Sequence, residues 1–256
     1  MTSSTLEGKV VIVTGASRGI GAASAVAFAE ARARVVLAAR SAESLSAVAA
    51  TIKQRGGEAL AVTTDVTDAA SVERLVGKAL DAFGRLDAAF NNAGTGHSPK
   101  RLAEFSPEEF EAGLKANLSG VFLGMRYEIP AMLLSGGGAI VNMSSSAGLQ
   151  GAPGMGPYTA AKHAVVGLTR TAAIDYAKSN IRVNALAPGP IENERMAARL
   201  TPEMRGFIGA QVPMGRMGSM DEVARAAVWL CSDEASFVTG AVLSVDGGRL
   251  AGTAGA

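Results

Sequence analysis

Residues 10–21 read Val10-Val11-Ile12-Val13-Thr14-Gly15-Ala16-Ser17-Arg18-Gly19-Ile20-Gly21, an apolar run that passes directly into a glycine-rich turn. Glycines in such a turn let the chain bend sharply and let backbone amides approach a pyrophosphate at the start of the next helix. Glycine turns after strands are often only structural, but this one follows the first strand of a strand–helix–strand unit. We therefore predict a dinucleotide-binding turn whose contacts are Gly15, Ser17, Arg18, Gly19, Ile20 and Gly21.

The rest of the chain alternates short apolar runs with longer helical patterns. The runs predict seven strands, at 10–13, 34–38, 59–63, 86–91, 139–143, 181–187 and 241–245. Helices are predicted at 19–33, 42–55, 69–83, 107–134, 158–179 and 220–230, with 107–134 dividing into two near Gly113. Several strands are apolar at successive positions, as in parallel strands covered on both faces. The pattern predicts a single α/β domain over 1–256, a Rossmann-type doubly wound parallel sheet of seven strands with helices on both faces.

The segment 188–217 breaks this regular alternation. It contains Pro190, Pro202 and Pro213 together with amphipathic helical turns, and it directly follows the end of a predicted strand. Ligands of open α/β sheets bind outside the carboxyl ends of the strands. We expect a mobile lid over the site, with a surface loop as the alternative.

Composition narrows the class of partner. The chain has 256 residues, 48% of them hydrophobic, and its net charge of +1 gives no reason to expect nucleic acid or a membrane surface. Cys231 is the only cysteine, which excludes an intrachain disulfide, and the polar start lacks the apolar core of a signal peptide. No apolar run approaches the roughly 20 residues that cross a bilayer. We expect a cytoplasmic protein without a metal site.

The end of the second predicted strand bears on cofactor choice. An NAD enzyme places a carboxylate there to bind the ribose 2′-hydroxyl, whereas this strand ends in Ala39-Arg40-Ser41. Arg40 and Arg18 can converge on one corner and grip a 2′-phosphate, with Ser41 beside them. The residues favour NADP(H), with NAD(H) as the alternative if both arginines are only solvated surface groups.

Two further turns follow predicted strands. Asp65-Val66 is expected to contact the adenine, although Asp65 is nearly as well suited to cap the helix at 69–83. The turn Asn91-Asn92-Ala93-Gly94 is expected to bring its backbone close to the cofactor, and an ordinary Asn/Gly turn is the alternative.

Tyr158 and Lys162 stand four residues apart at the start of a predicted helix, so their side chains share a face. A free phenol has a pKa of about 10, and a neighbouring ammonium lowers that pKa toward the working range of an acid–base catalyst. Ser145, in a run of serines after the strand 139–143, can hydrogen-bond a substrate carbonyl. Asn117 is a polar residue among apolar ones. Each feature alone has an ordinary structural reading, as a surface pair, a loop or an exposed amide.

Taken together and in order, these motifs resemble the short-chain dehydrogenase/reductase family, in its subfamily of about this chain's length. The resemblance runs from about Leu6 to Gly248 and includes the glycine turn, Asn91–Gly94, Asn117, Ser145, Tyr158 with Lys162, and Pro188-Gly189. It implies an enzyme that transfers a hydride between a nicotinamide cofactor and a ketone or secondary alcohol. A redox-sensing binding protein and an epimerase or dehydratase of the same superfamily are the rival interpretations.

The resemblance implies a role for each matching residue. Tyr158 would be the general acid in reduction and the base in oxidation, while Lys162 would bind the nicotinamide ribose and lower the pKa of the phenol. Ser145 would polarise the carbonyl, Asn117 would hold a helix open around a relay water, and Thr14 would brace the turn. The remaining cofactor contacts would be Asn92, Ala93, Gly94, Pro188, Gly189, Ile191 and Asn193, the last at a position where many relatives have threonine.

The family also implies a homotetramer and leaves the substrate open. The expected pocket walls, 95–99, 147–155 and the 188–217 lid, are mostly apolar and favour an apolar ketone or alcohol. Reductases of carrier-bound 3-oxoacyl groups resemble the chain closely. Many of these have a basic residue just before the serine-bearing strand, whereas residues 133–139 offer none, so we favour a free small molecule.

Overall fold

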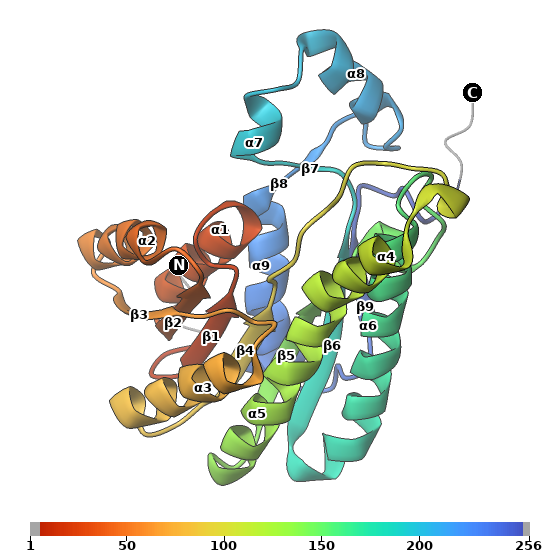
Figure 1. Cartoon of the computed structure of the whole chain (residues 1–256). Helices are drawn as coiled ribbons and strands as arrows, with labels where there is room; N and C mark the ends of the chain where they lie inside the picture. The colour runs from red at the N-terminus through yellow and green to blue at the C-terminus, as the bar shows by residue number, and fades with distance from the viewer. Residues whose placement is uncertain (1–5, 253–256) are drawn as a thin grey trace.

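The computed structural model describes residues 6–252, except for the side chain of Arg195, and contains a parallel sheet of seven strands in the order β3-β2-β1-β4-β5-β6-β9 (Figure 1). The strands are β1 (Val10–Thr14), β2 (Arg34–Ala39), β3 (Glu58–Thr63), β4 (Ala88–Asn91), β5 (Gly138–Met143), β6 (Ile181–Pro188) and β9 (Val242–Val245). The strand order reverses between β1 and β4, and open α/β sheets bind their ligands outside the carboxyl ends of the strands at such a point. Each predicted strand is confirmed to within two residues at either end.

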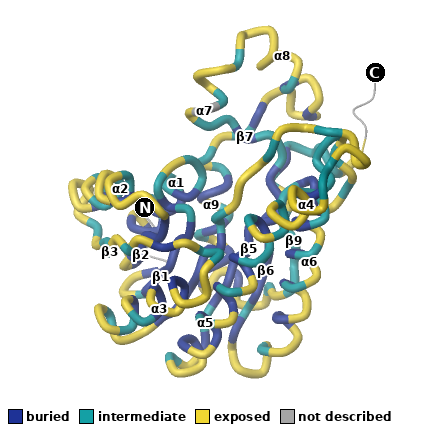
Figure 2. Tube along the Cα trace, in the orientation of Figure 1, coloured by how far each residue is buried: buried dark blue, intermediate teal, exposed yellow. Residues whose placement is uncertain are grey.

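Helices cover both faces of the sheet, as predicted. One face carries α1 (Gly19–Glu30), α2 (Ala42–Gln54) and α9 (Met220–Cys231), and the other carries α3 (Ala69–Phe83), α5 (Gly120–Leu134) and α6 (Gly156–Tyr176). Val11 and Val13 of β1 pack into the first core, whereas Val10 and Ile12 pack into the second. Because alternate side chains of a strand point to opposite faces, two buried faces require an uninterrupted apolar run. Figure 2 shows the central strands buried, whereas the outer strands β3 and β9 are partly exposed.

The long stretch 107–134 divides near Gly113, as predicted. Helix α4 (Pro107–Leu114) ends one residue after this glycine and passes into a π-helical turn at Lys115–Ser119 before α5 begins. Gly113 also allows close packing, because a β-carbon there would lie 2.6 Å from Cβ of Pro157 on α6. The amide of Asn117, within the π-helical turn, donates to the carbonyl of Gly113 at 3.1 Å, so a side chain occupies an acceptor of the helical ladder.

The segment 188–217 projects beyond the carboxyl ends of the strands, at the top of Figure 1. It holds the short strand β7 (Ile191–Glu192) and the helices α7 (Glu194–Ala197) and α8 (Pro202–Ala210). β7 pairs in parallel with β8 (Gly218–Ser219), and Glu192 forms an ion pair with Arg205 of α8 at 2.6 Å. The β7–β8 pair joins the two ends of the segment, and the ion pair fastens α8 to β7.

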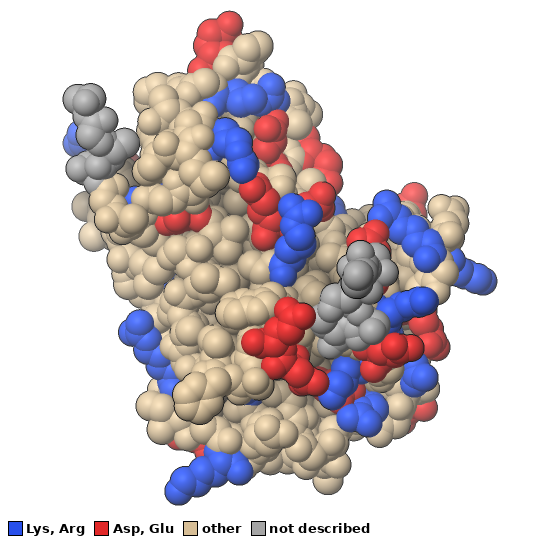
Figure 3. Space-filling model, turned by 180° about the vertical axis from the view of Figure 1, so that it is seen from behind, with Lys and Arg blue, Asp and Glu red and all other residues tan. Residues whose placement is uncertain are grey.

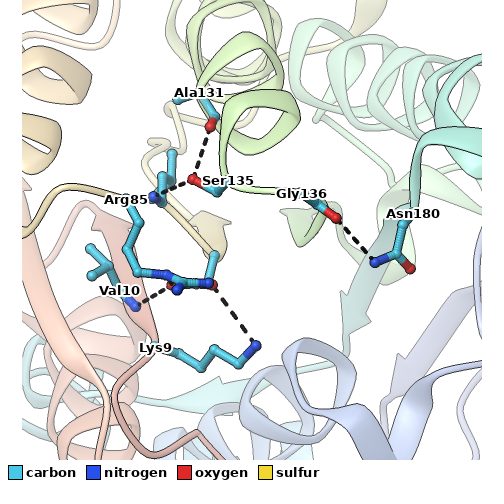
Figure 4. A network of polar contacts seen from close by, with 9 residues as sticks. Lys9, Val10, Arg85, Ala131, Ser135, Gly136 and Asn180 are labelled. Carbon is cyan, nitrogen blue, oxygen red and sulfur yellow. Dashed lines mark hydrogen bonds and ion pairs between the residues drawn. The ribbon is translucent and has the colours of Figure 1, made fainter.

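A polar network lies at the amino ends of the strands, opposite to the site (Figure 4). The carboxylate of Asp87 accepts from the amide of Val10 at 2.9 Å and from two nitrogens of Arg85, and Lys9 lies 3.8 Å away. Ser135 accepts from the amide of Leu86 at 3.1 Å. These bonds hold together the loops at the amino ends of β1 and β4, at the end of the sheet opposite to the glycine turn.

The surface has no dominant charge on the face seen in Figure 3, where acidic and basic side chains are interspersed. Among residues 6–252, no helix is long and apolar enough to span a bilayer, and no cluster of three or more potential metal ligands occurs.

Candidate active site

The glycine turn between β1 and α1 has the backbone shape that the sequence predicts. Gly15 and Gly19 have positive φ angles of 67° and 58°, a region that glycine enters without strain. A β-carbon on Gly21 would lie 2.2 Å from the carbonyl oxygen of Gly15, so only glycine allows α1 to start this close to the turn. Helix α1 has neither a side-chain cap nor an acidic residue in its first turn. Its first amides therefore have no anionic partner within the helix, which suits a phosphate.

The segment after β4 is fastened to this turn. The hydroxyl of Thr14 accepts from the amide of Ala93 at 3.0 Å, and the side-chain amide of Asn92 donates to the carbonyl of Thr14 at 2.9 Å. The brace expected of Thr14 is therefore present. These bonds hold the two loops together beside the carboxyl ends of β1 and β4.

Asn117 holds the next part of the same segment from the π-helical turn. Its Oδ1 accepts from the amide of Thr95 at 3.0 Å, and its Nδ2 donates to the carbonyl of Thr95 at 2.9 Å. A β-carbon on Gly94 would lie 2.7 Å from Oδ1 of Asn117 and 3.6 Å from Nζ of Lys162. Asn117 is 1% exposed, so the alternative of a surface-facing amide is wrong.

Lys162 and Tyr158 share one face of α6, as their spacing predicts. Nζ of Lys162 lies 5.6 Å from the centroid of the Tyr158 ring and donates to the carbonyl of Met143 at 2.7 Å. The lysine is 2% exposed, and burial lowers its pKa to about 8, because the ammonium has lost water on all sides. The reading of this pair as an ordinary surface pair is therefore wrong.

The pKa of the Tyr158 phenol shifts in the opposite direction from the one expected. Burial raises it, and the hydrogen bond with Ser145 opposes that rise only in part. Lys162 directs its ammonium to the carbonyl of Met143, and no lowering by Lys162 is found. The phenol is therefore held in its protonated form at neutral pH, the state of a proton donor.

The structure distinguishes the three serines that follow β5. Ser144 is buried and donates its hydroxyl to the carbonyl of Lys162 at 2.9 Å, which fastens the strand to α6. Ser146 is also buried, at the start of a short 3₁₀ turn. Ser145 is half-buried, its hydroxyl accepts from the amide of Ala147 at 3.2 Å, and it lies close enough to the Tyr158 phenol to oppose the rise of its pKa. Ser145 is therefore the serine beside the phenol, as predicted.

Arg18 and Arg40 are both exposed, after β1 and β2 respectively, and neither forms an ion pair with any residue in 6–252. Arg40 lies close enough to Asp65 to lower the pKa of that carboxyl, although hydrogen bonds from Thr67 have the larger effect. Ser41 caps α2 by accepting from the amide of Ser44 at 3.3 Å.

The alternative role of Asp65 as the cap of α3 is wrong, because Asp68 caps that helix. Asp65 instead accepts from the amide and the hydroxyl of Thr67, at 2.9 and 2.8 Å. The Val66 side chain packs on Gly120, where a β-carbon would lie 2.8 Å from Cγ2 of the valine. Asp65 and Val66 thus form a tight turn at the end of β3.

The remaining predicted contacts lie where β6 ends. Gly189 donates its amide to the carbonyl of Val245 at 3.0 Å, directly after Pro188. Ile191 is buried in β7, and Oδ1 of Asn193 accepts from the amide of Met196 at 3.0 Å as the cap of α7. The Asn193 side chain thus has a structural partner of its own, whereas the resemblance implies a contact with the cofactor.

The sequence interpretation missed a buried polar cluster beneath this site. Glu128 of α5 is 1% exposed and accepts from the side-chain amide of Asn91 at 2.9 Å. The signal was available, because a carboxylate in the apolar pattern Val121–Leu134 lies on the same face as Val121 and Met125, at the spacing of helical turns.

Comparisons with known proteins agree with this geometry. A family profile described as enoyl-(acyl carrier protein) reductase matches residues 15–249. A 2,5-dichloro-2,5-cyclohexadiene-1,4-diol dehydrogenase of Sphingobium indicum is 44% identical over 248 residues, which cover 96% of this chain and 98% of the relative. The 3-oxoacyl-[acyl-carrier-protein] reductase FabG of Thermotoga maritima is 39% identical over 243 residues, covering 95% and 98%.

A solved structure is similar over its whole length. A protein from Burkholderia xenovorans described as a short-chain dehydrogenase/reductase superimposes with a TM-score of 0.90 at 38% identity, over 97% of this chain and 98% of that one. Proteins of this family are oxidoreductases that use nicotinamide cofactors. Sequence, fold and site agree, and the chain belongs to the short-chain dehydrogenase/reductase family.

Proposed function

We propose that this enzyme is an NADP(H)-dependent oxidoreductase that interconverts a ketone and a secondary alcohol, with Tyr158 as the acid–base group. The observation that carries the proposal is the meeting of three side chains at the carboxyl edge of the sheet. Nζ of Lys162 lies 5.6 Å from the centroid of the Tyr158 ring, and Ser145 lies close enough to the same phenol to oppose the rise of its pKa. A protein that only binds a dinucleotide needs the glycine turn but not this set.

In the reductive direction, the residues act on the carbonyl oxygen of the substrate. A bound nicotinamide cofactor supplies the hydride. Ser145 orients the carbonyl by donating its hydroxyl, and Tyr158 donates its phenolic proton to the oxygen as negative charge develops there. The phenol carries this proton at neutral pH as any phenol does, and burial moves its pKa further up. Lys162, anchored on Met143, would bind the nicotinamide ribose and hold its ammonium 5.6 Å from the centroid of the Tyr158 ring.

The proposed cofactor site follows the carboxyl ends of the strands. The Gly15–Gly21 turn and the uncapped start of α1 would hold the pyrophosphate, and Arg18, Arg40 and Ser41 would hold the 2′-phosphate. Asp65 and Val66 would contact the adenine. The nicotinamide end would be held by Asn92, Ala93, Gly94, Lys162, Pro188, Gly189, Ile191 and Asn193, with Asn193 contributing only if it leaves the cap of α7.

A free, apolar ketone or alcohol is the proposed substrate. Leu149 is exposed beside the site, and Met204 and Phe207 are exposed on α8 of the overlying segment. The relative from Sphingobium is named for a cyclic diol, whereas the relative from Thermotoga is named for a carrier-bound 3-oxoacyl group. The deciding experiment offers a panel of ketones and alcohols with NADPH or NADP⁺, and a 3-oxoacyl group on its carrier protein in a parallel arm. Turnover of the carrier-bound substrate alone would favour the carrier-dependent reductase.

The segment 188–217 is proposed to act as a lid over this substrate. The β7–β8 pair holds the two ends of this segment together, and the ion pair of Glu192 with Arg205 fastens α8 to β7. Met204 and Phe207 on α8 expose apolar surface. A closing lid would bury that surface on the substrate. Limited proteolysis within 194–210 should slow when NADPH and an accepted ketone are both added.

We further propose a homotetramer. Phe110 and Phe122 on α4 and α5, and Trp229 and Phe237 in and after α9, expose large apolar side chains that an interface would cover. Light scattering on the purified enzyme measures the assembly directly, and a monomer at working concentration would contradict the proposal.

A further inference from the structure

Four buried polar side chains form a chain of contacts just below the candidate site. Nδ2 of Asn91, at the end of β4, donates to Oε2 of Glu128 at 2.9 Å and to Oδ1 of Asn142 at 3.2 Å. Nδ2 of Asn142, on β5, donates to the hydroxyl of Thr169 on α6 at 3.0 Å. All four residues are at most 2% exposed, so no bulk water competes for these groups.

The hydroxyl of Thr169 on α6 determines the direction of the hydrogen bonds of Asn142 and Asn91. The hydroxyl of Thr169 donates to the carbonyl of Val165 at 2.8 Å, so it can only accept from Asn142. Oδ1 of Asn142 must then face Asn91, and Asn91 must present its Nδ2 to both Asn142 and Glu128. One polar atom is left over: Oδ1 of Asn91 is buried and has no hydrogen-bond partner. Leaving such an atom unpaired is costly, so a donor is missing from the cluster.

The carboxyl of Glu128 is the group that can provide this donor. A planar amide and a planar carboxylic acid can pair at two points, and the bond between Nδ2 of Asn91 and Oε2 of Glu128 is one of them. A carboxylic acid carries one O–H donor, whereas a carboxylate carries none. As the neutral acid, Glu128 would satisfy Asn91 at two points; as the anion, it would face an unpaired oxygen.

The electrostatic surroundings favour the neutral form. Burial raises the pKa of Glu128 to about 7, and only the Asn91 hydrogen bond opposes this. The strands β4 and β5 carry no charged residue, and α3 turns Leu75 and Val76 toward this core. On the far side of the sheet, burial raises the pKa of the Cys231 thiol, so this thiol adds no charge near Glu128 at neutral pH, and Arg182 of β6 directs its guanidinium to the carbonyls of Leu230, Ser232 and Val238.

Each member of the cluster adjoins a part of the site. Asn91 directly precedes Asn92 and Ala93, which are bonded to Thr14. Asn142 precedes Met143, whose carbonyl accepts from Lys162. Thr169 lies two turns beyond Lys162 on α6. Helix α5 approaches β4 closely here, because a β-carbon on Gly124 would lie 2.5 Å from Oδ1 of Asn91.

We propose that Glu128 is a positioning residue, held as the neutral acid and paired at two points with the Asn91 amide, which sets the position of the Asn92–Gly94 segment and of Lys162. Its role in cofactor binding rests on the proposed function, whereas its protonation and its hold on Asn92–Gly94 do not. Loss of its proton would leave a negative charge beside an unpaired oxygen and loosen the segment.

Three variants of the full-length enzyme test this. Glu128→Gln keeps one donor and one acceptor without any charge, Glu128→Leu removes both, and Glu73→Gln on the exposed side of α3 is the matched control. Carbon-13 NMR of labelled glutamate carboxyls should show one resonance titrating near pH 7 that Glu128→Gln lacks. Hydrogen exchange at the Ala93 and Thr95 amides should match wild type in Glu128→Gln and be about 10-fold faster in Glu128→Leu, as when one buried polar group loses its partner. Exchange in Val72–Ala79 should not change.

NADPH titration adds a functional reading. At pH 6 Glu128→Gln should bind NADPH as wild type does, and Glu128→Leu several-fold more weakly. Damage in Glu128→Gln equal to that in Glu128→Leu would show that the carboxylate is required and overturn the neutral pair. Normal exchange and normal NADPH affinity in Glu128→Leu, with only a lower Tm, would overturn the positioning role. If Glu128→Leu does not fold, the carboxyl titration of wild type and the hydrogen exchange of Glu128→Gln still test whether Glu128 acts as the neutral acid. Failure of wild type to bind NADPH would count against the proposed function alone.

Discussion

The ammonium of Lys162 donates to the main-chain carbonyl of Met143 at 2.7 Å, from a helix to the end of the neighbouring strand. The return contact runs from Ser144 to the carbonyl of Lys162 at 2.9 Å. These two bonds fix α6 against β5 at the turn of helix that also carries Tyr158. The position of the phenol relative to Ser145 therefore depends on a buried lysine.

Replacing Tyr158 by phenylalanine should leave NADPH affinity nearly unchanged and lower kcat by about 10²–10⁴-fold, the usual contribution of acid–base catalysis. Only the phenolic oxygen and its proton are removed, and the ring remains beside Lys162. Steady-state kinetics with any accepted ketone, together with a cofactor titration, measures both quantities. Tyr176→Phe, at the far end of the same helix, is the control and should keep full activity. A Tyr158→Phe enzyme with most of its kcat would remove Tyr158 from its role.

Replacing Lys162 by methionine should raise the cofactor Kd and lower kcat, and it should change the response to pH. Burial lowers the folded-state pKa of Lys162 from 10.5 to about 8. Between these values the unfolded chain holds the proton and the folded chain does not, so the free energy of unfolding of wild type should rise with pH relative to Lys162→Met. NADPH affinity should fall over the same rise, as the ammonium is lost. Denaturant unfolding and cofactor titration from pH 7 to pH 10 measure the two trends, and parallel profiles for both proteins would contradict the assignment.

Substitutions at the end of β2 should reverse the preference of the enzyme for NADP(H) over NAD(H). Arg18 and Arg40 together favour a 2′-phosphate, and charged hydrogen bonds of about 1.5–3 kcal/mol each correspond to about 10–150-fold in affinity. Wild type should therefore prefer NADP(H) in kcat/KM. Ala39→Asp combined with Arg40→Ala should prefer NAD(H), because it adds repulsion as well as removing attraction. High salt should weaken NADPH binding more than NADH binding. Equal kcat/KM for both cofactors in wild type would show that Arg18 and Arg40 are solvated surface residues without a role in cofactor choice.

Gly21→Ala should abolish cofactor binding and cost about 1–3 kcal/mol of stability, as overpacking does. The new β-carbon would meet the carbonyl oxygen of Gly15 at 2.2 Å, and main-chain atoms must move to make room. Gly77→Ala in α3 is the matched control: nothing lies within 4 Å of its β-carbon, and it should stabilise by about 0.5–1 kcal/mol. Calorimetry and NADPH titration measure both variants. Retention of wild-type affinity in Gly21→Ala would mean that the turn can relax.

The sequence alone determined the strands, the helices that cover them and the glycine turn, because each depends on a local pattern. Val10–Val13 are apolar in succession and both faces of β1 are buried, so the run itself predicts a central parallel strand. The spacing of Tyr158 and Lys162 likewise places both side chains on one face of α6. Gly21 marks a close approach, since no other residue leaves that room.

Tertiary structure decided the features that depend on partners distant in the sequence. The sequence predicts the break near Gly113, but not that Gly113 packs against Pro157 or that Asn117 opens the helix by bonding Thr95 and Gly113, which lie on different elements. The direction of the Tyr158 pKa shift follows from burial that no local pattern reports. In the sequence, Glu128 is one polar residue in an apolar helix. Only the fold shows its partner, Asn91 of β4, which lies 37 residues away in the chain. Periodicity specifies which face of an element is buried, whereas packing alone specifies what that face meets.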